Sequence, residues 1–243
     1  MLYLCMVPPW QQGVVTRIEQ ATHNTRRYFI QLRETDSFPF KPGQFVTLDL
    51  PIHEQKNKRW RSYSIASMPD GSNVFELLIS YVPDGLGTNY IFKEIKEGSE
   101  FTLRGPHGVF TLPEEIDRDI IMVCTGTGIA PFRSMLHYID KHNLPHKNLH
   151  LIFGTRVQSD LLYADEMREL EKSLENFTYH PTLSREDWDG HKGYVHAIYE
   201  SICKDCPPAN FFLCGWRNMI DEARHKIVNM GYDKKSIHLE LYG

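Results

Sequence analysis

The chain has 243 residues, of which 41% are hydrophobic and 24% are charged, and it carries a formal net charge of −4. This length suits one large domain or two small ones, and the composition is that of an ordinary globular protein. No apolar run approaches the roughly 18 residues that span a bilayer, and no basic cluster indicates a nucleic-acid partner.

The first part of the chain is predicted to form a small antiparallel barrel. Short β-rich runs recur there, separated by turn residues such as Pro-Gly and Asp-Gly, as is typical of all-β domains. The predicted strands cover residues 13–20, 25–34, 43–51, 59–67, 74–82 and 100–106. One helical stretch, “GTNYIFKEIKEG” at residues 87–98, interrupts them.

Strands and helices alternate after residue 115. Apolar strands are predicted at residues 119–124, 148–154, 177–183, 210–214 and 237–241, with helices that begin near Pro131, Asp160, Tyr194 and Trp216. This alternation favours a doubly wound α/β domain, in which a parallel sheet has helices on both faces. We therefore predict a β-barrel domain over residues 1–114 and an α/β domain over residues 115–243, with “TLPEEIDRD” as the hinge.

The cysteines favour a reducing compartment. An odd number of scattered cysteines argues against a disulfide scaffold, and the five are Cys5, Cys124, Cys203, Cys206 and Cys214. Cys203 and Cys206 form a lone CxxC pair, which we interpret as two ordinary thiols rather than a redox pair or half a zinc site, because structural zinc usually needs four ligands. The cysteine spacing of an iron–sulfur cluster is absent. The apolar start also lacks the charged region of a signal peptide, so we expect a cytoplasmic protein.

The segment “DIIMVCTGTGIAPFRSML” carries a nucleotide-binding signal. A buried strand leads into Thr125, Gly126 and Gly128, and Pro131 then opens a helix, where proline is well tolerated. Glycines at such a turn let a pyrophosphate approach the backbone, and the helix N-terminus favours its negative charge. A tight turn without a ligand is the alternative, because Pro131 stands where the GxGxxG pattern has its third glycine.

A second segment, “RWRSYSIAS”, carries polar residues along a predicted strand. Alternation places Arg61 and Tyr63 on one side and Ser62 and Ser64 on the other. An arginine can hold a diphosphate through two hydrogen bonds, and a tyrosine can stack on a flat ring. By itself the segment is equally consistent with a strand that binds no ligand.

Four motifs in order resemble the ferredoxin–NADP reductase superfamily over nearly the whole chain. “RSYS” resembles its flavin-binding Arg-x-Tyr-Ser, and “GPHGVF” resembles the Gly-Pro-x-Gly-x-Phe that closes its barrel. “GTGIAPF” is similar to its pyridine-nucleotide loop, and “CGWRNMI” is similar to its Cys-Gly-x-x-x-Met. The resemblance implies that the barrel binds FAD and that the α/β domain binds NADP(H), with NAD(H) as the alternative.

The resemblance implies roles for the flavin-binding residues. Arg61 would bind the FAD diphosphate, Tyr63 would stack on one face of the isoalloxazine, and Ser64 would hydrogen-bond near its N5 atom. The resemblance also assigns the intervening Ser62 and the loop residues Gly87 and Thr88 to the flavin site.

The resemblance also implies which residues bind the nicotinamide cofactor. Its pyrophosphate would lie on Thr125, Gly126 and Gly128, while Cys214 and Gly215 would border the nicotinamide ring. Cys214 is equally consistent with a small core residue, because hydride transfer does not require a thiol.

The chain end “IHLELYG” matches the Glu-x-Tyr ending of plant-type and related members. The resemblance implies that Tyr242 covers the flavin face opposite Tyr63 and that Glu240 is a charged or proton-relaying neighbour. Gly243 extends the match by one residue. The alternative is a terminal strand with a half-buried tyrosine. Ser64, Cys214, Glu240 and Tyr242 are thus the predicted catalytic residues.

Basic residues near two strand ends favour NADP(H) over NAD(H). NADP-specific relatives use Ser-Arg, a further basic residue and sometimes a tyrosine to hold the 2′-phosphate, and the matching residues are Arg156, Ser184, Arg185, Lys192 and Tyr194. Arginines at these ends suit an anion. Glu186 and Asp187 follow at once, so NAD(H) stays open.

The sequence therefore predicts a monomeric FAD-containing reductase. NADPH would deliver a hydride to the flavin, and single electrons would pass to ferredoxin or flavodoxin. One alternative is the reductase component of an oxygenase or cytochrome system. Another is a non-catalytic subunit that binds flavin and nucleotide. Such a subunit would be expected to lack the residues of the Glu-x-Tyr ending or of the Cys-Gly pair, whereas both motifs are present here.

Overall fold

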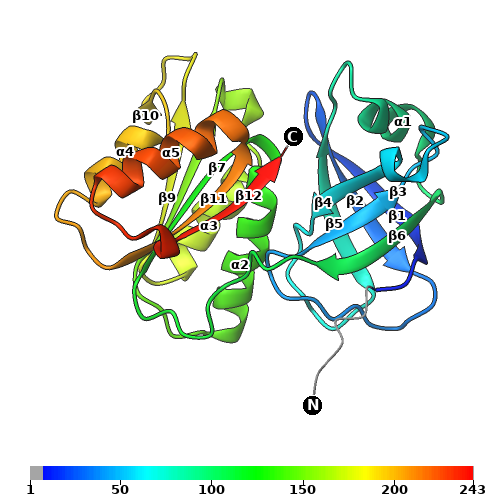
Figure 1. Cartoon of the computed structure of the whole chain (residues 1–243), viewed down its shortest axis with the longest axis horizontal. Helices are drawn as coiled ribbons and strands as arrows, with labels where there is room; N and C mark the ends of the chain where they lie inside the picture. Colours follow the sequence, from blue (N-terminus) through cyan, green and yellow to red (C-terminus); the bar gives the residue numbers. More distant parts are fainter. Residues whose placement is uncertain (1–7, 243) are drawn as a thin grey trace.

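The alternating runs in the first part of the chain form one antiparallel sheet. A computed structural model describes residues 8–242, and it places this sheet in the right-hand domain of Figure 1. The strands are β1 (Gln11–Thr22), β2 (Thr25–Leu32), β3 (Phe45–Asp49), β4 (Trp60–Ser64), β5 (Val74–Ser80) and β6 (Glu100–His107). Their order is β4-β3-β6-β1-β2-β5, and a bridge between Ile65 and Leu77 joins the two edges. The sheet therefore curls into the predicted barrel.

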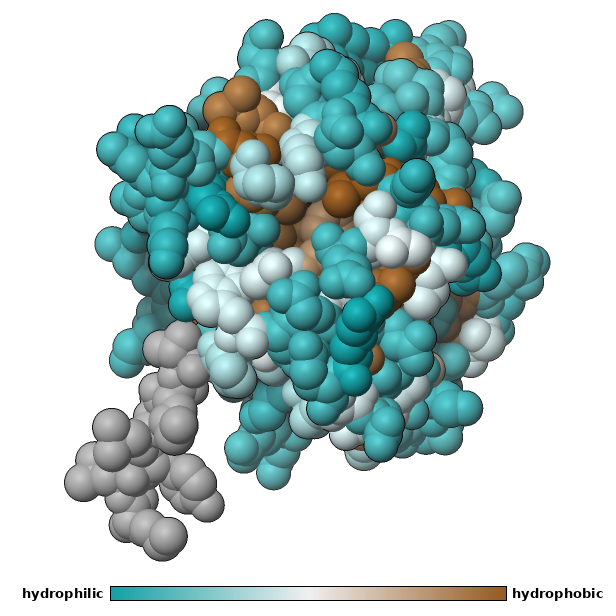
Figure 2. All heavy atoms as spheres, turned by 90° about the vertical axis from the view of Figure 1, so that its right-hand side faces the viewer, coloured by the Kyte–Doolittle hydropathy of each residue, from teal (hydrophilic) through white to brown (hydrophobic). Residues whose placement is uncertain are grey.

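Apolar side chains fill the inside of this barrel. Val46, Leu48 and Leu77 are fully buried there, and helix α1 (Leu86–Glu94) adds Ile91. The outer face is mainly hydrophilic, with apolar side chains gathered in a hollow near its middle (Figure 2). Alternation along each strand thus separates a buried face from a solvated one, as an antiparallel sheet requires.

The second part of the chain forms a parallel sheet. Its strands are β7 (Asp119–Thr125), β8 (Leu149–Thr155), β9 (Phe177–Leu183), β10 (His191–Lys192), β11 (Ala209–Trp216) and β12 (Ile237–Tyr242). Their order is β10-β9-β8-β7-β11-β12, so the order reverses between β7 and β11. In doubly wound sheets this reversal opens a crevice at the carboxyl ends of the strands. The predicted fold class is confirmed.

Helices cover both faces of this sheet. The helices are α2 (Ile129–His142), α3 (Ala164–Ser173), α4 (His196–Ile202) and α5 (Arg217–Asn229). Buried residues of α2 and α3 form one core with the sheet, and those of α4 and α5 form another on the opposite face. Helix α3 begins four residues after the predicted Asp160, because Gln158–Asp160 forms a separate 3-10 turn. The two-residue strand β10 carries no apolar period and was not predicted.

The two domains lie side by side and share part of one core (Figure 1). Phe110, which follows the barrel, packs against Phe132 of α2 with ring centroids 5.8 Å apart. Ala66 and Leu78 of the barrel belong to the same buried cluster. The predicted boundary between residues 114 and 115 lies between β6 and β7 and stays a prediction.

Residues 1–7, which include Cys5, and Gly243 lie outside the described part of the chain. Among residues 8–242, no helix is long and apolar enough to cross a membrane.

Candidate active site

The last strand brings the chain end to the barrel. Strand β12 is the edge of its sheet nearest the barrel, and its last residues lie between the two domains (Figure 1). The Ser64 hydroxyl donates a hydrogen bond to Glu240 Oε1, and the Tyr242 hydroxyl donates to Ser64 Oγ over 2.7 Å. A residue of the flavin motif and the predicted Glu-x-Tyr ending therefore form one chain of hydrogen bonds.

Cys214 completes this cluster. It lies beside Glu240 in the register of β11 and β12, and its side chain is fully buried. Burial raises the pKa of the Cys214 thiol well above its ordinary value. The thiol therefore stays protonated at neutral pH, and a reactive thiolate is not available there. The structure thus brings together the four predicted catalytic residues, and it leaves their roles as predictions.

Burial also sets the protonation of the other two groups. It raises the pKa of Glu240, while the hydrogen bond from Ser64 acts in the opposite direction. It raises the pKa of the Tyr242 hydroxyl well above its ordinary value. Tyr242 is therefore a neutral donor to Ser64, and Glu240 holds a proton more tightly than an exposed carboxyl does.

The predicted pyrophosphate loop lies at the reversal of strand order. Gly126 has a φ of 54°, and no atom lies within 4 Å of the position that a Cβ would take there, so its backbone is open. The Thr125 hydroxyl oxygen is buried and has no hydrogen-bond partner among residues 8–242. An open backbone beside an unsatisfied hydroxyl suits an incoming ligand.

Gly128 and Gly215 have a packing role that the sequence did not reveal. A Cβ on Gly128 would collide with the carbonyl oxygen of Cys214, and a Cβ on Gly215 would lie 2.6 Å from Thr125 Oγ1. The loop that follows β7 therefore packs closely against the end of β11, and neither glycine position has room for a side chain. This contact keeps Cys214 and Gly215 of β11 beside the predicted pyrophosphate loop.

The predicted flavin phosphate site lies at the N-terminus of α1. No side chain caps this helix, and a Cβ on Gly87 would lie 3.0 Å from Arg61 Cγ. Gly87 thus lets the arginine lie over the helix end, where an anion is favoured. Arg61 Nη1 donates to the carbonyl oxygens of Lys58 and Trp60, over 3.0 and 2.7 Å. Those two bonds orient the guanidinium toward this site.

Thr88, Ser62 and Tyr63 differ in their surroundings. The Thr88 hydroxyl donates to the carbonyl oxygens of Val82 and Gly85, over 3.1 and 3.2 Å, and so it shapes the loop. Ser62 is exposed and lies 3.1 Å from the Thr47 hydroxyl, whereas Ser64 is buried. Tyr63 is half-buried, and burial raises the pKa of its hydroxyl.

The residues predicted to select the nucleotide gather at the carboxyl ends of β8 and β9. The Arg185 amide donates to the carbonyl oxygen of Arg156 over 2.9 Å, and Ser184 Oγ donates to the Thr155 carbonyl over 3.2 Å. Lys192 forms an ion pair with Asp187, whereas neither arginine forms an ion pair within residues 8–242. Tyr194 is 76% exposed.

Comparisons with known proteins place the chain in a family. Two family models match it: an oxidoreductase FAD-binding domain over residues 12–112 and an oxidoreductase NAD-binding domain over residues 122–225. Ferredoxin–NADP reductase B of Sorangium cellulosum is 34% identical over 215 residues, which are 85% of this chain and 86% of that protein. The chain belongs to the ferredoxin–NADP reductase superfamily.

Other members differ in length. The glycine betaine monooxygenase reductase subunit of Pseudomonas aeruginosa is 30% identical over 234 residues, and the match covers 93% of this chain but only 63% of that protein. A ferredoxin NADP⁺ reductase from Neisseria gonorrhoeae, solved with bound FAD and NADP, superimposes with a TM-score of 0.79. At 24% identity, over 96% of this chain and 98% of that one, it shows the shared fold.

Membership of the superfamily makes the chain an oxidoreductase that uses FAD and a nicotinamide nucleotide. The structure fits both groups. The Arg61 side chain packs closely over the Gly87 backbone at the α1 N-terminus, which no side chain caps, and the loop at Gly126 is open beside the Thr125 hydroxyl, which has no partner among residues 8–242. The confirmed predictions are therefore the family, the two cofactors and the oxidoreductase class.

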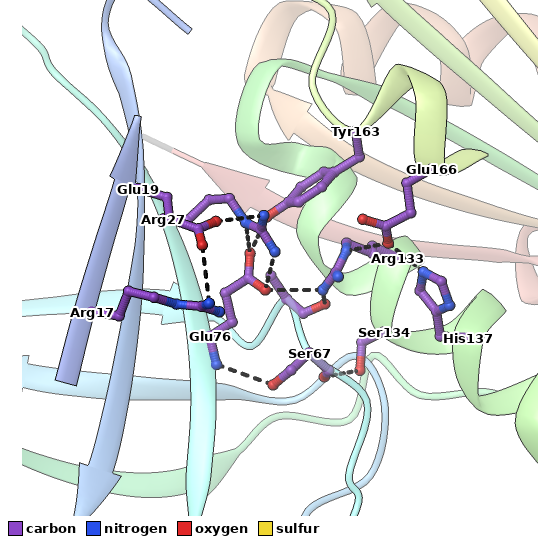
Figure 3. A network of polar contacts seen from close by, with 11 residues as sticks. Arg17, Glu19, Arg27, Ser67, Glu76, Arg133, Ser134, His137, Tyr163 and Glu166 are labelled. Carbon is purple, nitrogen blue, oxygen red and sulfur yellow. Dashed lines mark hydrogen bonds and ion pairs between the residues drawn. The ribbon is translucent and has the colours of Figure 1, made fainter. Parts of the chain in front are cut away.

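Sequence reasoning missed a polar network between the domains. Glu76 of β5 contacts arginines of both domains, and Tyr163 and Glu166 join them (Figure 3). A signal for it was present, because Glu76 is the single charged residue in the apolar strand “VFELLIS”. A charge in such a strand needs a partner, which the sequence does not name.

Proposed function

We propose that this protein oxidises NADPH at FAD and passes electrons singly to a separate carrier, ferredoxin or flavodoxin. One observation carries the proposal. Ser64 of the barrel meets Glu240 and Tyr242 of the α/β domain beside the fully buried Cys214. This cluster joins the flavin strand β4 to the strand ends at which nicotinamide nucleotides bind in doubly wound folds.

The chain's part in the reaction is binding, orientation and proton placement. Arg61 and the N-terminus of α1 hold the FAD diphosphate, and Thr125, Gly126 and Gly128 hold the nucleotide pyrophosphate. When bound, FAD supplies a ring that accepts a hydride and releases electrons one at a time. Tyr63 and Tyr242 exclude water from the two sides of that ring. Ser64 accepts a hydrogen bond from Tyr242 and donates one to Glu240, a carboxyl whose pKa burial raises.

The proposed nucleotide is NADPH. Arg156 and Arg185 are exposed side by side at two adjacent strand ends, where a 2′-phosphate would lie, and Ser184 at the end of β9 bonds to Thr155 at the end of β8. Two guanidiniums attract a phosphate strongly, and a 2′-hydroxyl offers them much less. Lys192 has a minor part in this proposal, because Asp187 already neutralises it.

The proposed acceptor follows from the similarity to the Sorangium protein. That relative is named a ferredoxin–NADP reductase, and this chain covers 86% of its length. The proposed enzyme is a monomer in the cytoplasm, divided into domains 1–114 and 115–243, and its carrier is a separate protein.

A second candidate function is the reductase component of an oxygenase. It is favoured by the similarity to the glycine betaine monooxygenase reductase subunit, of which this chain spans 63%. In that case electrons would pass to a carrier that serves an oxygenase. The chemistry at Ser64, Glu240 and Tyr242 would be the same, and only the docking partner would differ.

Reductase assays test the proposal. The purified protein should be yellow, the released flavin should be FAD, and NADPH should support reduction of ferredoxin or flavodoxin. Faster reduction of an oxygenase-type carrier would favour the second candidate. A protein that binds FAD but transfers no electrons to any carrier would be the non-catalytic subunit, and a colourless protein that fails to take up FAD would refute both enzyme proposals.

A further inference from the structure

A buried carboxylate lies at the contact between the two domains. Glu76 of β5 is 2% exposed. Arg27 of β2 donates to both of its oxygens, over 2.7 and 3.0 Å, and Arg133 of α2 donates to Oε2 over 3.1 Å. One arginine comes from each domain, so this carboxylate is held from both sides (Figure 3).

Arg133 also binds two further groups with the same guanidinium. Its Nε donates to Glu166 of α3 over 2.6 Å, and its Nη1 donates to the Ala66 carbonyl oxygen over 2.9 Å. His137, one turn further along α2, also contacts Glu166. A rigid fork that joins a strand, a loop and a helix restricts their relative positions more than a point charge would.

Tyr163 adds a further contact to this network, and its backbone adopts an uncommon conformation. It precedes α3 with a φ of 53°, which is uncommon for a residue other than glycine. Its hydroxyl donates to Glu76 Oε1, and its ring lies beneath Arg133, 4.6 Å from the guanidinium carbon. Such a conformation persists only where surrounding contacts determine it. The contacts across the domain boundary are therefore strong enough to fix the start of α3.

The network connects directly to both halves of the candidate active site. Ala66 and Ser67 follow Ser64 by two and three residues, and Ser134 Oγ donates to the Ser67 carbonyl oxygen over 2.6 Å. Helix α2 starts immediately after the loop at Gly126–Gly128. Arg133 lies four residues into it, about 6 Å along the axis. A single short helical segment thus links the nucleotide loop to the strand that carries Ser64.

We propose that Glu76, Arg133 and Tyr163 form an interdomain lock that positions the nucleotide loop against Ser64 for hydride transfer. This inference rests on the proposed function. The three are positioning residues, because they act through Ala66, Ser67 and the start of α2. The lock fixes the approach of the two cofactors, and it leaves each binding site intact within its own domain.

Calorimetry of the FAD-loaded full chain tests whether the interdomain lock couples the unfolding of the two domains. The wild type should unfold in one transition, and Arg133→Met should separate the unfolding of the two domains into two. Arg33→Met is the control, since Arg33 pairs with Glu100 over 2.6 Å on the surface of the barrel domain and makes no hydrogen bond or ion pair to the other domain among the described residues, and it should keep one transition. A single transition in Arg133→Met, or two in the wild type, would overturn the lock.

Anaerobic rapid mixing with NADPH tests the positioning part. Arg133→Met should lower the limiting rate of flavin reduction on the order of 10- to 100-fold, the scale for a misplacement of about 1 Å. Its apparent dissociation constant for NADPH and its FAD retention should match the wild type. Arg133→Lys should recover only part of the rate, because it keeps the charge and loses the fork. An unchanged limiting rate in Arg133→Met would overturn the inference.

The design separates two kinds of failure. If NADPH does not reduce the wild-type flavin, the proposed function fails, and calorimetry still decides whether the lock exists. If Arg133→Met does not fold, Tyr163→Phe takes its place in both measurements, because it removes only the hydroxyl that binds Glu76. Wild-type behaviour of Tyr163→Phe in both measurements would then overturn the inference.

Discussion

Replacement of Tyr242 by serine tests whether this residue covers the flavin. The substitution removes an aromatic ring that packs against the α/β core and a hydroxyl that donates to Ser64 over 2.7 Å. If the ring occupies the face where the nicotinamide must lie, the two compete for the same stacking contact. Such a contact contributes about 0.5–1.5 kcal/mol beyond area burial.

The magnitude follows from that contact. Release from competition by about 0.5–1.5 kcal/mol corresponds to NADP⁺ binding that is roughly 2- to 13-fold tighter in Tyr242→Ser. NADH use should improve relative to NADPH use, because nicotinamide stacking then depends less on anchoring by the 2′-phosphate. Product release should slow, since the ring no longer displaces the bound nicotinamide.

Titration of the oxidised variant with NADP⁺, followed by absorbance, is the assay. A long-wavelength charge-transfer band should appear as the nicotinamide stacks on the flavin. Tyr242→Phe is the matched control: it keeps the ring, loses only the hydrogen bond to Ser64 and should resemble the wild type. A merely structural tyrosine predicts lower thermal stability with unchanged affinity and no new band, and that result in Tyr242→Ser would refute the lid.

Three further predictions concern single residues of the site. Arg61→Ala should weaken FAD retention by about 2–3 kcal/mol, the scale for hydrogen bonds to charged groups; equilibrium dialysis would contradict this if the FAD dissociation constant did not change. Arg185→Ala should lower kcat/KM for NADPH and leave that for NADH nearly unchanged, because only the 2′-phosphate loses a partner. Lys192→Ala, which removes a lysine already paired with Asp187, should change the ratio of kcat/KM for NADPH to kcat/KM for NADH much less. Equal kcat/KM values for the two nucleotides in the wild type would overturn the NADP assignment. Burial raises the pKa of Glu240, so the folded chain keeps a proton that the unfolded chain releases, and stability falls as pH rises above the ordinary carboxyl pKa of about 4.3. Glu240→Gln should flatten that fall in thermal melts across acidic and neutral pH, and parallel curves for the two proteins would argue against a buried titrating carboxyl.

The sequence by itself determined the two-domain architecture and most of the elements. Before residue 115 apolar side chains recur about every two residues, and after it segments with a repeat of about 3.6 residues appear. This spacing indicates which face of a strand or helix is buried. The turn at Gly126 and the Arg-x-Tyr-Ser strand could be predicted from the sequence for a similar reason. A turn with positive φ and a strand with alternating polar residues both depend on neighbours in sequence.

Only the tertiary structure decided which distant residues meet. Ser64 and Glu240 are 176 positions apart, and their contact exists because β12 is added to the sheet edge that faces the barrel. The partners of Glu76 were equally hidden, since they come from β2, α2 and the start of α3. A charged residue in an apolar strand indicates that the buried carboxylate needs cationic partners. The packing of the two domains determines which residues those partners are. That packing depends on the shapes of whole surfaces rather than on any local pattern.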